Sequence, residues 1–125
     1  MTRTEITTDE IAKPVGPFSA AVRAEQYTFV SGQVAQDPAT GALIDGDVSA
    51  QTEQAFRNVS AVLKAAGKTL DDVVRVGVYL TDMADFAVVN AVYGQVFSAP
   101  YPARTAIGVA ALPLGAAVEV DAIAN

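Results

Sequence analysis

The chain has 125 residues, of which 51% are hydrophobic, and a formal net charge of −6. It contains neither cysteine nor histidine, which excludes disulfides, metal sites built on thiolates or imidazoles, a cysteine nucleophile and a Ser-His-Asp triad. An acidic chain repels the phosphates of nucleic acid, so nucleic-acid binding is not expected. The length is that of one domain, covering residues 1–125.

The sequence carries no sign of a targeting or membrane segment. Residues 1–5 lack the apolar core of a secretory signal. An uncharged segment near the end of the chain, residues 105–118, is interrupted by proline and glycine and is shorter than the ~20 apolar residues of a membrane span. We therefore expect a cytoplasmic protein without membrane contact. The high aliphatic content also favours burial of apolar surface against another subunit.

The first half of the chain reads as strand, turn, short returning strand and helix. Residues 27–36 are rich in β-branched and aromatic types, residues 37–41 have turn chemistry, and residues 42–44 would be the returning strand. Asp47 or Ser49 would cap the helix that follows. Its apolar residues recur at helical spacing and predict one buried stripe: Ala55, Phe56, Val59, Val62, Leu63 and Ala66.

A charged residue and a glycine indicate where this helix begins and ends. Glu53 is expected in its first turn, where the helix dipole favours an anion, and Gly67 is expected to end it. A strand over residues 73–80 comes next, with a face made of Val74, Val76, Val78 and Leu80. Gly77 within that strand indicates either a bulge or a tight packing site.

A second helix and two strands complete the chain. Thr81 or Asp82 would cap the helix, with Asp85 at capping-box spacing, and the helix would run to about Ser98. Its buried face is predicted to be Phe86, Val89, Tyr93 and Phe97. Strands over residues 104–110 and 116–124, joined by a turn at 112–115, are predicted to form an antiparallel hairpin. The order of elements indicates an α+β fold with the helices on one face of the sheet.

Two charged residues are candidates for chemistry. Arg104 opens an otherwise uncharged strand, where its guanidinium would grip a small carboxylate in a cleft. The more common alternative is an edge arginine in a salt bridge or reaching solvent. Glu119 would act as a base if it were partly desolvated, but Asp121 on the same face favours a pair of solvated carboxylates.

Two polar residues are weaker candidates. Asn90 lies at the edge of the buried stripe of the second helix, where its amide would contact a ligand or a neighbouring backbone group. Ser31 ends a run of strand residues beside Gly32, and its hydroxyl would serve a ligand or simply bond to backbone.

Several motifs occur in the order and spacing of one family along nearly the whole chain. They are Gly16-Pro17-Phe18-Ser19, Val30-Ser31-Gly32-Gln33, residues 51–59, residues 78–83, Asp85-Phe86 with Val89-Asn90, Pro102-Ala103-Arg104-Thr105, residues 112–116 and Val118-Glu119-Val120. With these motifs the chain resembles the RidA/YjgF family of reactive-intermediate deaminases.

The resemblance implies a chorismate-mutase-like protomer, with a mixed β-sheet and two helices on one face, assembled as a homotrimer with clefts between subunits. It implies hydrolysis of enamines and imines such as 2-aminoacrylate to a 2-keto acid and ammonia, without cofactor or metal. Arg104 would bind the substrate carboxylate and Glu119 would orient or activate the attacking water. Ser31 and Asn90 would line the cleft, and the backbone at Thr105 and Ala106 would complete it.

Two departures from the family pattern affect the expected substrate. Phe18 stands where well-known members have tyrosine, so a hydroxyl is lost, and Ala106 stands where they often have cysteine. The alternatives to a general imine deaminase are a trimer of the same fold that binds ligands or acts as a chaperone without catalysis, and a pathway-specific deaminase of the aminomuconate type.

The predicted hairpin has a geometric consequence. Pairing of Val109 with Val118 would place Arg104 and Glu119 four positions apart, about 13 Å along the sheet. Two side chains so placed in one chain would not share a small substrate. The hypothesis that follows is that a neighbouring subunit or a register shift closes the gap.

Overall fold

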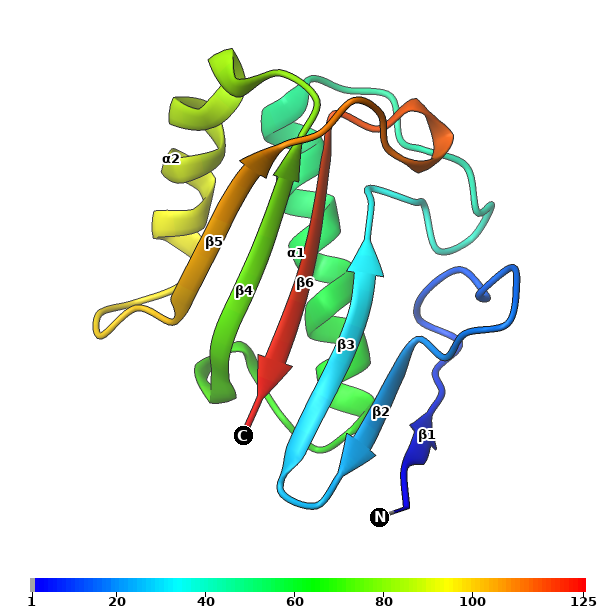
Figure 1. Cartoon of the computed structure of the whole chain (residues 1–125). Helices are drawn as coiled ribbons and strands as arrows, with labels where there is room; N and C mark the ends of the chain where they lie inside the picture. The colour runs from blue at the N-terminus through cyan, green and yellow to red at the C-terminus, as the bar shows by residue number, and fades with distance from the viewer. Residues whose placement is uncertain (1) are drawn as a thin grey trace.

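The computed structural model describes residues 2–125, so Met1 lies outside the described residues. Two helices and six strands make up the regular structure (Figure 1). They are β1 (Thr4–Ile6), β2 (Ala21–Ala24), β3 (Tyr27–Gln33), α1 (Val48–Ala65), β4 (Val73–Leu80), α2 (Phe86–Val96), β5 (Ala103–Gly108) and β6 (Val118–Ala124).

The six strands form one mixed sheet in the order β1-β2-β3-β6-β4-β5. All neighbouring pairs are antiparallel except β4 and β5, which run parallel. Both helices lie on the same face of the sheet, behind it in Figure 1, and leave the other face open. This arrangement confirms the predicted α+β fold with two helices on one face. Within residues 2–125, no helix is long and apolar enough to cross a membrane.

The core lies between the sheet and α1. Alternate residues of β6 point toward the helices, so Val118 and Val120 are fully buried while Glu119 and Asp121 point to the open face. The predicted stripe of α1 is confirmed, because every one of its members is buried. Burial of this stripe removes apolar surface from water at about 25 cal/mol per Å², which is the main force that holds α1 on the sheet.

The predicted hairpin of the last two strands is wrong. Strand β6 lies between β3 and β4, and β5 pairs only with β4. A parallel pair needs a crossover, and α2 supplies it between β4 and β5. The chain from Gly108 to Val118 then passes the end of β4, where the Val109 amide donates to the Leu80 carbonyl and the Thr81 amide to the Ala117 carbonyl. This segment connects β5 to β6, which are separated in the sheet by β4.

Several local predictions also need correction. Residues 42–44 form no strand, only a single bridge between Gln36 and Leu43. Val74 is exposed because the register of β4 against β6 shifts between Val73 and Arg75. Glu53 lies beyond the first turn, because α1 begins at Val48. Strands β1 and β2 were not predicted at all, because they are short and lack a regular apolar pattern.

The second helix begins later and ends earlier than the sequence indicated. A 3₁₀ turn over residues 83–85 precedes α2, and the Asp82 carboxylate caps that turn by accepting from the Ala84 amide. Asp85 makes no side-chain cap bond to α2. Phe97 follows the last residue of the helix, yet it is buried as predicted, along with Val89 and Tyr93.

Asp47 caps α1, and its removal is expected to lower stability. Its carboxylate accepts from the Ala50 amide at 2.9 Å, one of the helix-end N–H groups without an intrahelical partner. We expect Asp47→Ala to lower the free energy of unfolding by about 1 kcal/mol in urea titrations. Asp45→Ala, two residues earlier in an exposed loop, is the matched control and should change it little. Equal effects of the two substitutions would contradict the capping role.

Candidate active site

Arg104 projects from β5 toward the helices. It lies opposite Val76 of β4, whose side chain is in the core. Its Nη1 donates to Asn90 Oδ1 at 2.7 Å, and its Cζ lies 4.7 Å from the ring centroid of Tyr93 and 5.5 Å from that of Phe86. The two rings and the amide hold the guanidinium in one orientation.

The guanidinium of Arg104 keeps donors for a ligand. It forms no salt bridge with any described residue, and only one of its five N–H groups has a hydrogen bond. A cavity of about 350 Å³ lies beside it, lined by Asn90, Tyr93, Gly94, Tyr101, Pro102 and Arg104. Arg104 is therefore not an edge arginine held in a salt bridge within the described chain, and its remaining N–H groups are of the kind that bind an anion.

Burial raises the pKa of the Tyr93 hydroxyl, and the Arg104 charge opposes this only in part. Tyr93 is therefore a neutral aromatic wall for the guanidinium. Its hydroxyl oxygen is buried and has no hydrogen-bond partner among the described residues.

Glu119 lies on the opposite face of the sheet, against Gly32 of β3. A Cβ atom at Gly32 would come within 2.9 Å of the Glu119 carboxylate carbon, so only glycine leaves the carboxylate its place. Glu119 is half-buried and has no hydrogen-bond partner among the described residues. Burial, and secondarily the charge of Asp121, raises the pKa of Glu119. A desolvated carboxyl of this kind is suited to proton transfer.

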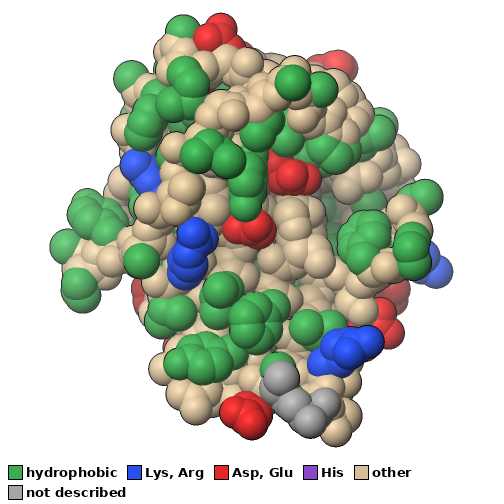
Figure 2. Space-filling view, viewed as in Figure 1, with side chains coloured by type: hydrophobic (Ala, Val, Ile, Leu, Met, Phe, Trp, Pro, Cys, Tyr) green, Lys and Arg blue, Asp and Glu red, His purple; other side chains and the backbone are tan. Residues whose placement is uncertain are grey.

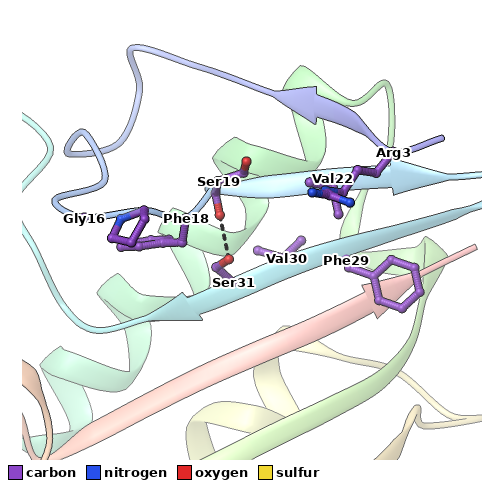
Figure 3. Close-up of a pocket in the computed structure, with 9 residues that line it drawn as sticks. Arg3, Gly16, Phe18, Ser19, Val22, Phe29, Val30 and Ser31 are labelled. Carbon is purple, nitrogen blue, oxygen red and sulfur yellow. Dashed lines mark hydrogen bonds between the residues drawn. The ribbon is translucent and has the colours of Figure 1, made fainter.

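Ser31 and Phe18 lie near Glu119. The Ser31 hydroxyl donates to the Ser19 carbonyl at 2.6 Å (Figure 3), which matches the backbone-bonding alternative and leaves its oxygen free to accept. Phe18 is 53% exposed and borders three cavities. One, of about 660 Å³, is also lined by Ser31, and another, of about 440 Å³, is also lined by Glu119.

The predicted residues thus form two groups that one chain does not bring together. Arg104 and Glu119 lie opposite Val76 and Tyr79 of β4, three residues apart, and so point to opposite faces of the sheet. They are also two strands apart, which gives about 14 Å between their Cα positions. The predicted hairpin of β5 and β6 does not form, but Arg104 and Glu119 are still too far apart in one chain to share a small substrate. No register shift joins the two residues.

Thr105 and Ala106 follow Arg104 on β5. Thr105 is exposed on the open face and accepts a hydrogen bond from the Arg75 guanidinium at 3.0 Å, while Ala106 packs partly against the core. Because β5 is the last strand of the sheet, its outer backbone groups have no strand partner within the described chain. They are available to a ligand or to another subunit.

Sequence reasoning missed several residues of these two groups. Phe86 and Tyr93 were predicted as core residues of α2, and only the fold shows that they also face Arg104. Asp121 was taken as a sign of solvation, but it is half-buried and hydrogen-bonded to Tyr79 and Gly77. Gly77 was the available signal for these contacts, because a glycine inside an apolar strand marks either a bulge or a tight packing site. The structure shows tight packing of Gly77 against Asp121, and the bulge of β4 lies between Val73 and Arg75.

A metal site is not apparent in the described part of the chain. With cysteine and histidine absent, aspartate and glutamate are the remaining ligands, and residues 2–125 hold no group of three or more of them placed to bind an ion.

Comparison with known proteins identifies the family. The profile of the family described as Endoribonuclease L-PSP matches residues 7–125. The chain belongs to this family, the RidA/YjgF family. It is 48% identical to the protein DfrA of Myxococcus xanthus over 99% of this chain and 96% of that one. It is 44% identical to the 2-iminobutanoate/2-iminopropanoate deaminase of Bos taurus over 99% of this chain and 90% of that one.

A solved structure shows that the RidA fold is shared in detail. The crystal structure of RidA from an Antarctic Psychrobacter species superposes with a TM-score of 0.93 at 46% identity, covering 97% of this chain and 98% of that one. At this similarity the six-stranded sheet and the two helices are those of the family.

Proposed function

We propose that this RidA-family protein hydrolyses 2-imino acids, formed from reactive enamines such as 2-aminoacrylate, to 2-keto acids and ammonia. The observation that carries the proposal is that the Arg104 guanidinium lies beside a small cavity with N–H groups that have no hydrogen-bond partner among the described residues. Planar guanidinium binds a carboxylate through two parallel hydrogen bonds, and every 2-imino acid carries one. The names of mammalian relatives at 44% identity support the same reaction.

The reaction needs little beyond positioning and proton transfer. Water adds to the imine carbon, and the C–O bond forms as the imine π electrons move to nitrogen. Glu119 takes one proton from the attacking water and returns it to the nitrogen, which gives a carbinolamine. The proton of the carbinolamine hydroxyl then passes through Glu119 to the nitrogen, and the C–N bond breaks as the C=O bond forms, which releases ammonia and the keto acid. A positioned proton-transfer group contributes roughly 10²–10⁴-fold. Neither histidine nor cysteine is required.

We also propose that the site forms between subunits of a homotrimer. Arg104 and Glu119 do not meet in one chain. Arg104 lies on β5, the edge strand, whose outer side has no strand partner within the described chain. Hydrophobic side chains surround charged groups near the middle of the open sheet face (Figure 2). Phe29 and Ile107 on that face and Tyr101 beside β5 are 40%, 45% and 59% exposed. Contact of the β5 edge with the open face of a neighbour would cover this surface and place Arg104 near Glu119.

In that arrangement Asn90 keeps Arg104 oriented, and Ser31 offers its hydroxyl oxygen as an acceptor for the imine N–H. Phe18 closes the cavity as an apolar wall, with one polar contact fewer than a tyrosine would give. The family description names an endoribonuclease, but a chain with a net charge of −6 and without histidine is poorly suited to bind and cleave RNA.

The test is imine hydrolysis in a coupled assay. An amino-acid oxidase generates 2-imino acids while semicarbazide competes for them, and the protein is added at increasing concentration. We expect semicarbazone formation to fall and keto acid and ammonia to rise together. Unchanged semicarbazone formation across small and bulky imino acids would overturn the proposal.

Phe18 favours one second candidate, a trimer that binds 2-keto acids without turnover. The missing hydroxyl removes a polar group that would contact substrate or water. Titration of a small 2-keto acid by calorimetry, combined with the imine assay, separates the two functions. Binding without any imine hydrolysis would favour the second.

A further inference from the structure

Two hydrogen bonds hold the side chain of Asp121 on the open sheet face. Its Oδ2 accepts from the Tyr79 hydroxyl at 2.9 Å, and its Oδ1 accepts from the Gly77 amide at 3.0 Å. Both donors belong to β4, the strand beside β6. Two hydrogen bonds of this kind stabilise the ionised carboxylate and fix its position.

The surroundings are built to hold Asp121 in that place. A Cβ atom at Gly77 would lie 3.1 Å from the Asp121 carboxylate carbon and 2.8 Å from the Tyr79 hydroxyl, so glycine alone leaves room for the contact. The hydrogen bond to Asp121, with burial, raises the pKa of Tyr79. The hydroxyl therefore stays protonated and continues to donate.

Glu119 is the nearest acidic neighbour on the same strand face. The two residues are two positions apart on β6, about 7 Å between Cα atoms. Asp121 has two donors, whereas Glu119 has none among the described residues and lies against Gly32. One carboxylate is fixed and charged, and the other is desolvated without a partner.

The other titratable groups facing Glu119 are few. Tyr79 lies directly opposite it on β4 and is neutral at pH 7, and Arg75 lies further along that strand beside Thr105. Lys13 lines the cavity that Glu119 borders. The neighbouring part of β3 contributes Ser31 and Gly32, which carry no charge. Asp121 is therefore the only acidic side chain beside Glu119 in the described structure.

We propose that Asp121 is a positioning residue for Glu119. The fixed negative charge of Asp121 adds to burial in making Glu119 hold and return a proton at the pH at which the site works. Tyr79 and Gly77 anchor that charge. The role of Glu119 as proton carrier comes from the proposed function, so this inference rests on it. Asp121 itself touches no substrate.

The test compares Asp121→Asn with the wild-type protein in two measurements. The first is the pH dependence of kcat/KM for imine hydrolysis, and the second is the titration of the Glu119 side-chain carboxyl followed by ¹³C NMR, with Glu119→Gln to assign the signal. Removing the neighbouring negative charge is expected to shift both to lower pH by about half a unit or more. Asp71→Asn, an exposed aspartate whose carboxylate has no hydrogen bond in the structure, is the matched control and should shift neither.

The two measurements separate the possible failures. A Glu119 titration that does not move in Asp121→Asn, or that moves equally in Asp71→Asn, overturns the proposal whatever the activity is. Absence of imine hydrolysis in the wild type together with a shifted Glu119 titration overturns the proposed function but supports the coupling of the two carboxyls. If asparagine destabilises the sheet, Asp121→Ser removes the same charge and is read in the same way.

Discussion

Replacement of Arg104 by alanine is expected to lower kcat/KM for 2-imino acids by about 10²-fold or more. The substitution removes the two N–H donors that would hold the substrate carboxylate, and loss of one partner from a desolvated charge pair costs roughly 2–5 kcal/mol. The aromatic wall of Phe86 and Tyr93 remains, so the fold is expected to persist. The measurement is the coupled imine assay together with the mass in solution by light scattering.

Arg104→Lys is the matched variant, because it keeps the charge but loses the planar fork. We expect it to recover only part of the lost activity. Dissociation of the oligomer in Arg104→Ala would show that Arg104 is a structural residue. An unchanged kcat/KM would show that Arg104 is not the carboxylate anchor.

The same variant tests whether the site is shared between subunits. Arg104→Ala and Glu119→Gln chains are each expected to be nearly inactive alone. In mixed trimers, a site that takes Arg104 from one chain and Glu119 from another is intact at about one interface in four for random mixing. Co-expression of the two variants should therefore restore about a quarter of the wild-type activity per site. No recovery would contradict a site that takes Arg104 from one chain and Glu119 from another.

The sequence predicted those parts of the fold that depend on residues close together in the chain. The stripe of α1 and its cap at Asp47 were predicted correctly, because helical spacing and capping are properties of adjacent residues. Strand pairing is not local. Nothing within residues 103–124 indicates that β6 pairs with β3 and β4, and a turn signal at Pro113 and Gly115 suggested a hairpin instead.

The candidate site shows the same division. Motifs identified Arg104, Asn90, Ser31 and Glu119, and the structure brings Arg104 to Asn90 directly. Which face of the sheet each residue occupies depends on the register with β4, which the sequence does not contain. The hydrogen bonds of Asp121 to β4 were not predicted for this reason. Two acidic residues at alternate strand positions look solvated until their neighbours on β4 are known.

Glu119→Gln is expected to lower kcat by roughly 10²–10⁴-fold, the range for loss of a positioned proton-transfer group. Glutamine keeps the shape and fits against Gly32, but it does not take a proton from water. The pKa of Glu119 is raised, so wild-type kcat/KM should fall as the pH drops through that raised value, and this acidic limb should vanish in the variant. Glu53→Gln, on exposed α1 surface, is the control. A residual acidic limb in Glu119→Gln would assign it to another group.

Stability separates this catalytic role from a structural one. A carboxyl whose pKa is higher in the folded state binds its proton more tightly there, so the charged form opposes folding. The wild type should therefore lose stability as the pH rises from the unfolded-state pKa through the folded-state pKa of Glu119. Glu119→Gln carries no such charge, and its free energy of unfolding at pH 7 should equal or exceed that of the wild type, with the difference shrinking in acid. A structural carboxylate would show the reverse, because its loss would destabilise the fold at neutral pH. A variant that is as stable as the wild type but inactive would show that Glu119 is retained for proton transfer at a cost in stability.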